Sequence, residues 1–179
     1  MSPRSEVTRE RIQALLEELG RKFRHPARLF LSGGEGLVWR GLRNATKDLD
    51  VHYEVDPNHH GELVDVLRRL KEKRKLSIEE AYPGDFIPLP DGAERRAAFV
   101  GRYGQVDVFL FDAYSVALSK LARGHARDLE DVKGLLAEGV IEEDELRRLF
   151  EAILPRYEAQ GVKADPARFR RMLELALGT

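Results

Sequence analysis

The spacing of hydrophobic positions divides the chain into a part that mixes helices with strands and a later part made of helices. Apolar residues at three- and four-residue steps predict amphipathic helices over 7–23 and around 63–70. Short apolar or alternating runs predict strands over 28–32 and 48–55 and a hairpin over 97–111. Further helices are expected near 113–122, 127–137 and 142–154, and a last one begins at Asp165-Pro166.

The change from a mixed to a helical pattern near 111–114 predicts two parts within the 179 residues. We expect an α/β core over 1–112 and a helical portion over 113–179 packed on that core. This pattern is typical of an α+β fold, with a small mixed β-sheet flanked by helices and a helical C-terminal portion. The segment 82–92 holds three prolines and two glycines, which predicts a loop.

Composition and charge narrow the class of protein. The hydrophobic fraction of 42% and the charged fraction of 34% are typical of a folded domain, and the formal net charge of -1 gives no global attraction to nucleic acid. The absence of cysteine excludes disulfides and thiolate metal sites and suits a reducing cytoplasm. No apolar run approaches membrane-spanning length, and residues 1–6 lack the apolar core of a signal peptide. We therefore expect a cytoplasmic protein with no membrane partner.

Carboxylates on the predicted strand 48–55 are the first candidates for chemistry. Side chains alternate along a strand, so Asp48 and Asp50 share one face, about 6–7 Å apart, with His52 beyond them. Two carboxylates at that spacing could hold Mg²⁺. Asp107 lies within the otherwise apolar run 106–111 and is the best candidate for a third ligand. The residues alone leave open that the pair decorates a solvent face and that Asp107 pairs with an arginine.

A diglycine turn precedes this strand. Gly33-Gly34 ends the apolar strand 28–32 and leads into a short helix expected over 35–42, and Asp48 follows Gly34 by fourteen residues. Glycines can take positive φ and let the backbone approach a ligand, while the start of a helix offers N–H groups to phosphate. The Ser32 hydroxyl could add a contact. An ordinary turn remains the alternative for a lone Gly-Gly pair.

These residues together resemble the nucleotidyltransferase superfamily of the DNA polymerase β type. Its signature is a Gly-Gly or Gly-Ser pair, about a dozen residues, Asp-x-Asp and a distant third carboxylate. An arginine and a threonine within 39–47, just before Asp48-Leu49-Asp50, are similar to the AbiEii-like branch, which includes nucleotidyltransferase toxins of toxin–antitoxin systems. The stretch 120–131 resembles a second motif of that branch, so that the resemblance spans 28–136.

The resemblance implies a magnesium-dependent nucleotidyltransferase that moves an NMP from an NTP onto an acceptor hydroxyl. The acceptor could be tRNA, a protein or a small molecule, and a cognate antitoxin could be a partner. The implied roles are nucleotide binding for Ser32, Gly33, Gly34, Lys120 and Asp128, and metal binding and catalysis for Asp48, Asp50 and Asp107. One departure is Glu35, because the branch often has a small or hydroxyl-bearing residue there.

Two other functions stay open at this stage. One is a catalytically silent binding module with the same fold, and the other is an RNA-binding helper that uses the basic run 68–75. Without the resemblance, Lys120 and Arg123 would be read as solvated helix positions. The pair His59-His60 has no carboxylate at ligand spacing, which favours a solvated loop or a helix start.

Overall fold

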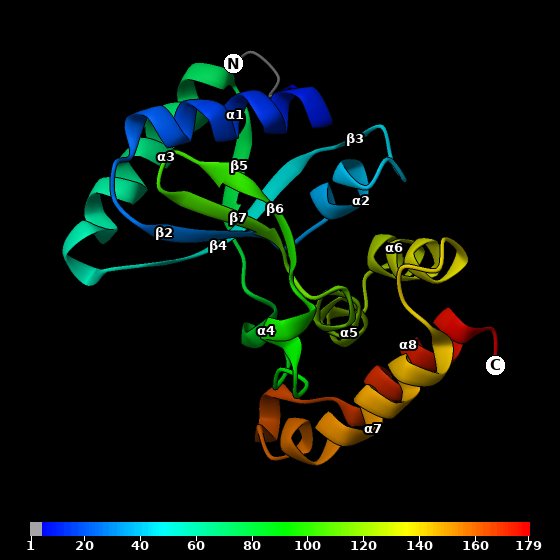
Figure 1. The fold of residues 1–179 in the computed structure, drawn as a ribbon. Helices are drawn as coiled ribbons and strands as arrows, with labels where there is room; N and C mark the ends of the chain where they lie inside the picture. The colour runs from blue at the N-terminus through cyan, green and yellow to red at the C-terminus, as the bar shows by residue number, and fades with distance from the viewer. Residues whose placement is uncertain (1–4) are drawn as a thin grey trace. The chain divides into compact units, whose positions relative to one another are not determined.

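A computed structural model describes residues 5–179, which divide into two compact units (Figure 1). Unit 1 contains the chain up to Ala81 together with Ala98–Phe111, and unit 2 contains Tyr82–Ala97 with Asp112–Thr179. Residues 1–4 belong to the stretch 1–6 that lacks the apolar core of a signal peptide, and they lie outside the described residues. Among those described, no helix combines the length and the apolar character needed to cross a membrane.

Unit 1 is built on a five-stranded mixed sheet, which confirms the predicted fold class. Its order is β5-β4-β2-β7-β6, with β2 antiparallel to β4 and parallel to β7. The strands are β2 (Ala27–Leu31), β4 (Asp48–Val55), β5 (Ser77–Glu80), β6 (Ala98–Tyr103) and β7 (Val106–Leu110). Two short strands, β1 (Val7–Thr8) and β3 (Ala45–Thr46), pair separately. The central position of β2 places the residue after it, Ser32, between two neighbouring strands.

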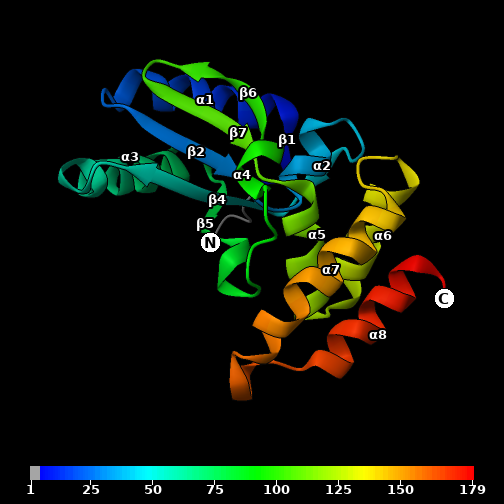
Figure 2. The same cartoon turned by 60° about the horizontal axis from the view of Figure 1, so that its bottom comes forward.

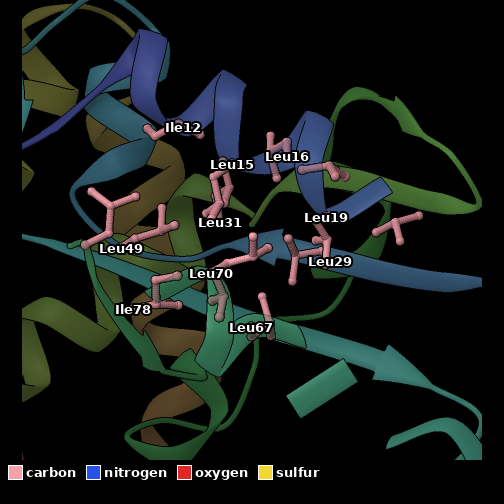
Figure 3. Close-up of a cluster of buried hydrophobic side chains, with 14 of the residues drawn as sticks. Ile12, Leu15, Leu16, Leu19, Leu29, Leu31, Leu49, Leu67, Leu70 and Ile78 are labelled. Atoms are coloured by element: carbon pink, nitrogen blue, oxygen red, sulfur yellow. The ribbon is translucent and has the colours of Figure 1, made fainter. Parts of the chain in front are cut away.

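Two amphipathic helices cover one face of this sheet, α1 (Arg9–Lys22) and α3 (His60–Arg74). The Thr8 side chain caps α1 by accepting a hydrogen bond from the N–H of Arg11. Figure 3 shows the apolar stripe of α1 against the leucines of β2, with side chains of α3 on the same core. Burial of these leucines, each worth about 1.5–3 kcal/mol, fixes which face of every strand points inward.

The alternation on β4 follows from that core. Leu49 and Val51 are buried at 0% and 2% exposure, whereas Asp48, Asp50 and His52 lie on the other face and are half-buried. Because successive side chains point to opposite faces, the apolar set turns the two aspartates away from the core. The predicted division of this strand into a core face and a carboxylate face is confirmed.

Unit 2 is helical, and it includes a segment that lies between β5 and β6 in the sequence. Its helices are α4 (Ala93–Arg96), α5 (Ala113–Arg123), α6 (Ala126–Ala137), α7 (Glu143–Glu158) and α8 (Pro166–Leu177). Figure 2 shows α7 and α8 side by side, and α5 packs against both α6 and α8. Asp165 caps α8 as predicted, since its side chain accepts from the N–H of Arg168 at 3.0 Å.

The structure differs from the sequence prediction in several elements. Helix α2 (Glu35–Trp39) ends before residue 42, and α7 continues through Pro155 to Glu158. Strand β5 was not predicted, because its sequence, Ser77-Ile78-Glu79-Glu80, lacks an apolar alternation. Two 3-10 helices, η1 (Pro57–His59) and η2 (Pro83–Asp85), also form within segments expected to be turns or loops.

Candidate active site

The diglycine turn lies directly beside Asp50. The N–H of Ser32, the residue after β2, donates to the carbonyl oxygen of Asp50 at 2.9 Å. A Cβ built on Gly33 would lie 2.1 Å from Asp50 Oδ2 and 2.8 Å from Asp50 Cγ, so the Asp50 carboxylate occupies the space that a side chain would need. Neither Gly33 nor Gly34 has positive φ, contrary to expectation. The turn requires Gly33 for its small size.

Gly34 is approached by two residues from the segment before β4. A Cβ on Gly34 would lie 3.1 Å from a guanidinium nitrogen of Arg43 and 3.1 Å from the hydroxyl oxygen of Thr46. Gly34 itself is in the right-handed helical region, with φ of -62° and ψ of -21°. The second glycine therefore leaves room for a cation and a hydroxyl beside the turn. Arg43 and Thr46 both lie within the segment 39–47 that contributes to the resemblance.

Glu35 is wholly buried behind the turn. Its Oε1 accepts from the N–H of Gly33 at 2.7 Å, and its Oε2 accepts from the N–H of Asp50 at 3.3 Å. Burial raises the pKa of Glu35 to about 8, and the negative charge of Asp50 adds to the effect. At neutral pH the side chain is therefore mostly uncharged and faces inward. It ties the diglycine turn to β4.

Ser32 also forms hydrogen bonds within unit 1. Its hydroxyl donates to the carbonyl oxygen of Ala81 at 2.8 Å, and its exposure is 8%. The N–H of Gly33 is likewise bonded to Glu35. Both groups hold the turn in place in this structure. Their contact with a nucleotide, expected from the resemblance, stays a prediction.

A third carboxylate joins the face of Asp48 and Asp50 from the neighbouring strand. In the parallel pairing of β4 with β5, Asp48 lies opposite Ser77 and Asp50 lies opposite Glu79. Paired residues point to the same side of a sheet, so the exposed Glu79 belongs to the carboxylate face. Glu79 was not among the predicted site residues, because β5 itself was not predicted. Its signal is visible only once the sheet register is known.

The structure does not bring Asp107 to the other two aspartates. In the parallel pairing of β2 with β7, Asp107 lies opposite Arg28, four positions before Ser32. Four residues of strand correspond to about 13 Å. Asp107 is on the same face as Asp50, but it is bound by Arg102 through two hydrogen bonds of 2.6 and 2.9 Å, which hold the pKa of Asp107 below its ordinary value. It therefore forms a salt bridge with an arginine, the alternative left open by the sequence.

Aromatic residues occupy the register where a carboxylate of β7 would meet the site. Phe109 lies opposite Phe30, and the N–H of Phe111 donates to Leu31 beside Ser32. The Phe30 ring centroid lies 5.3 Å from that of Phe109 and 5.7 Å from that of Phe111. His52 of β4 completes the group, 5.9 Å from Phe30. The face beside the carboxylates is thus aromatic on the β7 side and acidic on the β5 side.

Lys120 and Asp128 are brought together in unit 2. The Lys120 ammonium lies 3.4 Å from Asp128 Oδ1 and 2.9 Å from Asp131 Oδ2, and all three residues are buried. Arg123 adds a contact of 2.7 Å to Asp128. Lys120 is therefore not a solvated helix position. It binds two carboxylates between α5 and α6, and its contact with a nucleotide stays a prediction.

Several side chains of the basic run 68–75 form contacts within unit 1. Lys73 and Arg74 bind Glu18 at 2.5 and 2.6 Å, and they hold its pKa below the ordinary value. Lys71 donates to the carbonyl oxygen of Ile78 at 3.1 Å. These contacts attach the end of α3 to α1 and β5.

Comparison with known proteins agrees with this geometry. The family model described as "Nucleotidyltransferase of unknown function (DUF6036)" matches residues 10–166. The chain belongs to this nucleotidyltransferase family. The matched region contains the diglycine turn, the carboxylate face of β4 and the Lys120 cluster. No curated protein and no solved structure matches the chain.

Proposed function

We propose that this member of the DUF6036 family transfers an NMP from an NTP to an acceptor hydroxyl, with Mg²⁺ held by Asp48 and Asp50. The observation that carries the proposal is the Asp50 carboxylate lying over Gly33, with Asp48 on the same face of β4. Carboxylate oxygens are the ligands that Mg²⁺ prefers. Burial raises the pKa of Glu35, and the negative charge of Asp50 adds to the effect; a divalent cation would balance the charge of Asp50.

The surrounding residues fit the other parts of such a reaction. Arg43, beside Gly34, would bind phosphate oxygens, and Glu79, opposite Asp50, would take the role first given to Asp107 as third ligand or base. The acceptor oxygen forms a bond to the α-phosphorus, and the bond between the α-phosphorus and the oxygen that bridges to the β-phosphate breaks, so that pyrophosphate leaves. The proton of the acceptor hydroxyl passes to a carboxylate. Bound Mg²⁺ would supply charge stabilisation at the phosphate oxygens.

The direct test incubates the purified chain with Mg²⁺ and each α-labelled NTP. Three arms supply tRNA, a protein extract or small hydroxyl compounds, and the label identifies the acceptor. We expect Asp50→Asn and Asp48→Asn to lower transfer by at least about 10²-fold, because the groups that balance the transition-state charge are lost. Glu54→Gln is the matched control, since it lies on the same strand and face but binds Arg28. Equal activity of the wild type and Asp50→Asn would overturn the proposal.

Calorimetry separates this enzyme from a silent binding module. The enzyme should bind an NTP only when Mg²⁺ is present, and Asp50→Asn should remove that dependence. Binding of neither metal nor nucleotide by a folded wild type would favour the silent module. The toxin–antitoxin role implied by the AbiEii-like resemblance is part of the proposal, and it predicts that expression of the wild type, but not of Asp50→Asn, slows cell growth.

A further inference from the structure

The end of the sheet opposite the diglycine turn gathers two histidines and a glutamate. Strands β2 and β4 are antiparallel, and Ala27 pairs with Val55, so the residues before β2 lie beside those after β4. His25 lies just before β2, and His59 ends η1, shortly after β4. Glu62 follows in the first turn of α3. The antiparallel register therefore brings together three segments that the sequence separates.

The potential ligand atoms of these three side chains already lie close together. His25 Nε2 is 3.0 Å from Glu62 Oε2, and the ligand atoms of His25, His59 and Glu62 all lie within 4.8 Å of one another. Bonds of about 2.0–2.2 Å in a tetrahedral zinc site place ligand atoms roughly 3.3–3.5 Å apart. The pair at 3.0 Å lies slightly inside that spacing, and pairs separated by up to 4.8 Å need movements on the order of 1 Å. The His25 and Glu62 side chains are 34% and 48% exposed, which leaves them room to adjust.

We propose that His25, His59 and Glu62 bind a divalent transition-metal ion, with zinc as the best match, and that water completes the coordination. Two imidazole nitrogens and one carboxylate suit zinc and its neighbours, whereas Mg²⁺ prefers an all-oxygen set. Among the residues that the structure describes, this is the one group of three histidines or carboxylates with such spacing.

The neighbouring contacts hold the first two ligands next to each other. The His25 and His59 rings stack face to face with centroids 3.6 Å apart and planes 6° apart, so one ring must tilt before both nitrogens can bind the same ion. The buried Phe23 ring meets His25 edge-on, at a centroid distance of 5.4 Å. A bound ion would join the start of β2 to the start of α3. It would therefore stabilise unit 1.

This site is independent of the proposed nucleotide site. Asp48 begins the eight-residue strand β4 and Val55 ends it, which corresponds to a separation of about 23 Å. Loss of zinc binding would therefore leave the proposed transfer reaction untouched, and an inactive enzyme could still bind zinc.

The test is a zinc titration of the full chain without an affinity tag, after treatment with a chelator. We expect one zinc per chain at equimolar metal. Removing a ligand should weaken binding by at least about tenfold in His25→Gln, His59→Gln and Glu62→Gln. The matched control is His60→Gln, because His60 neighbours His59 in sequence but its ring packs 5.7 Å from Tyr53. The control should bind zinc as the wild type does.

Thermal unfolding gives a second measurement that does not depend on activity. Zinc should raise the unfolding midpoint of the wild type and of His60→Gln but not that of His59→Gln, and Mg²⁺ should not replace zinc. The proposal is overturned if the wild type binds no zinc at one equivalent. It is also overturned if His59→Gln binds as tightly as the wild type, or if His60→Gln loses as much affinity as His59→Gln.

Discussion

Buried carboxylates are stabilised in different ways in the two units. In unit 1, Glu35 accepts hydrogen bonds from two backbone N–H groups, and its pKa is raised to about 8 by burial and by the charge of Asp50. In unit 2, Asp128 and Asp131 are buried against the Lys120 ammonium. The second arrangement balances charge internally and is typical of a structural network, whereas the first gathers carboxylates beside a turn and is typical of a site that receives a cation.

The largest expected effect on stability comes from breaking the balanced cluster. Lys120→Met removes the ammonium that both Asp128 and Asp131 contact, while Arg123 still binds Asp128, so we expect the free energy of unfolding to fall by about 3–5 kcal/mol. Urea unfolding followed by circular dichroism measures this change. The matched control is Lys133→Met, because Lys133 is half-exposed and lies 3.6 Å from Glu130 at the surface, so its loss should cost at most about 1 kcal/mol. Similar losses in both variants would show that the Lys120 cluster is not the structural network described here.

The second expectation concerns the pH dependence produced by Glu35. Its pKa is about 8 in the folded protein, against an ordinary value of 4.5. Between those values the unfolded chain releases the proton while the folded chain keeps it, so the contribution of Glu35 to stability falls as pH rises from about 5 to about 8. The slope can reach about 1.4 kcal/mol per pH unit. Glu35→Gln removes this slope.

Urea unfolding of the wild type and Glu35→Gln at several pH values measures the difference. We expect the free energy of unfolding of the wild type, relative to that of Glu35→Gln, to fall steadily as pH rises, because only the wild type has an ionisable group at position 35. Asp50→Asn should reduce the slope in part, since the Asp50 charge is the second cause of the raised pKa. Parallel pH profiles for the wild type and Glu35→Gln would contradict the buried, neutral state of Glu35.

A smaller effect is expected from filling the space above the diglycine turn. Gly33→Ala places a Cβ against the side chain of Asp50, which must move, at a cost of about 1–3 kcal/mol in the free energy of unfolding. Magnesium affinity should fall as well, because Asp50 is displaced. Gly36→Ala is the matched control: it lies in α2 with open space around its Cβ, and it should stabilise the protein by about 0.5–1 kcal/mol. If Gly33→Ala behaves like Gly36→Ala, the turn does not require a small residue.

The sequence predicts helices and strands in which hydrophobic positions recur at a regular interval. It does not predict elements that form because their backbone pairs with a neighbouring strand. The bounds of β4 match the prediction, because Leu49 and Val51 alternate with Asp48 and Asp50 on a half-buried strand. Strand β5 has no such period, and it forms because its backbone pairs with β4. The missed Glu79 follows directly from the missed strand.

Two features of the candidate site, the strand register and the burial of Glu35, could likewise not be predicted from the sequence. The prediction that Asp107 lies on a strand is correct. Its distance from Asp50, however, depends on which residue of β2 pairs with Asp107, and this pairing cannot be predicted from the sequence. The inward direction of Glu35 depends on how α2 packs, which its five residues do not reveal. The motif thus pointed to Gly33 and to two carboxylates that the structure places beside each other, while the neighbouring Glu79 becomes visible only through the register of β5.

The smallest expected effect decides between Asp107 and Glu79 as the third carboxylate. Asp107 is partly exposed and bound by Arg102, so Asp107→Asn should cost at most about 1 kcal/mol of stability, and NMP transfer should continue because the residue lies about 13 Å along the sheet from Ser32. Glu79→Gln should instead lower transfer with little change in stability, since Glu79 is exposed and opposite Asp50. Assaying both variants beside the wild type makes each the control for the other. Loss of transfer in Asp107→Asn alone would restore Asp107 to the site and require a different sheet register in the working enzyme.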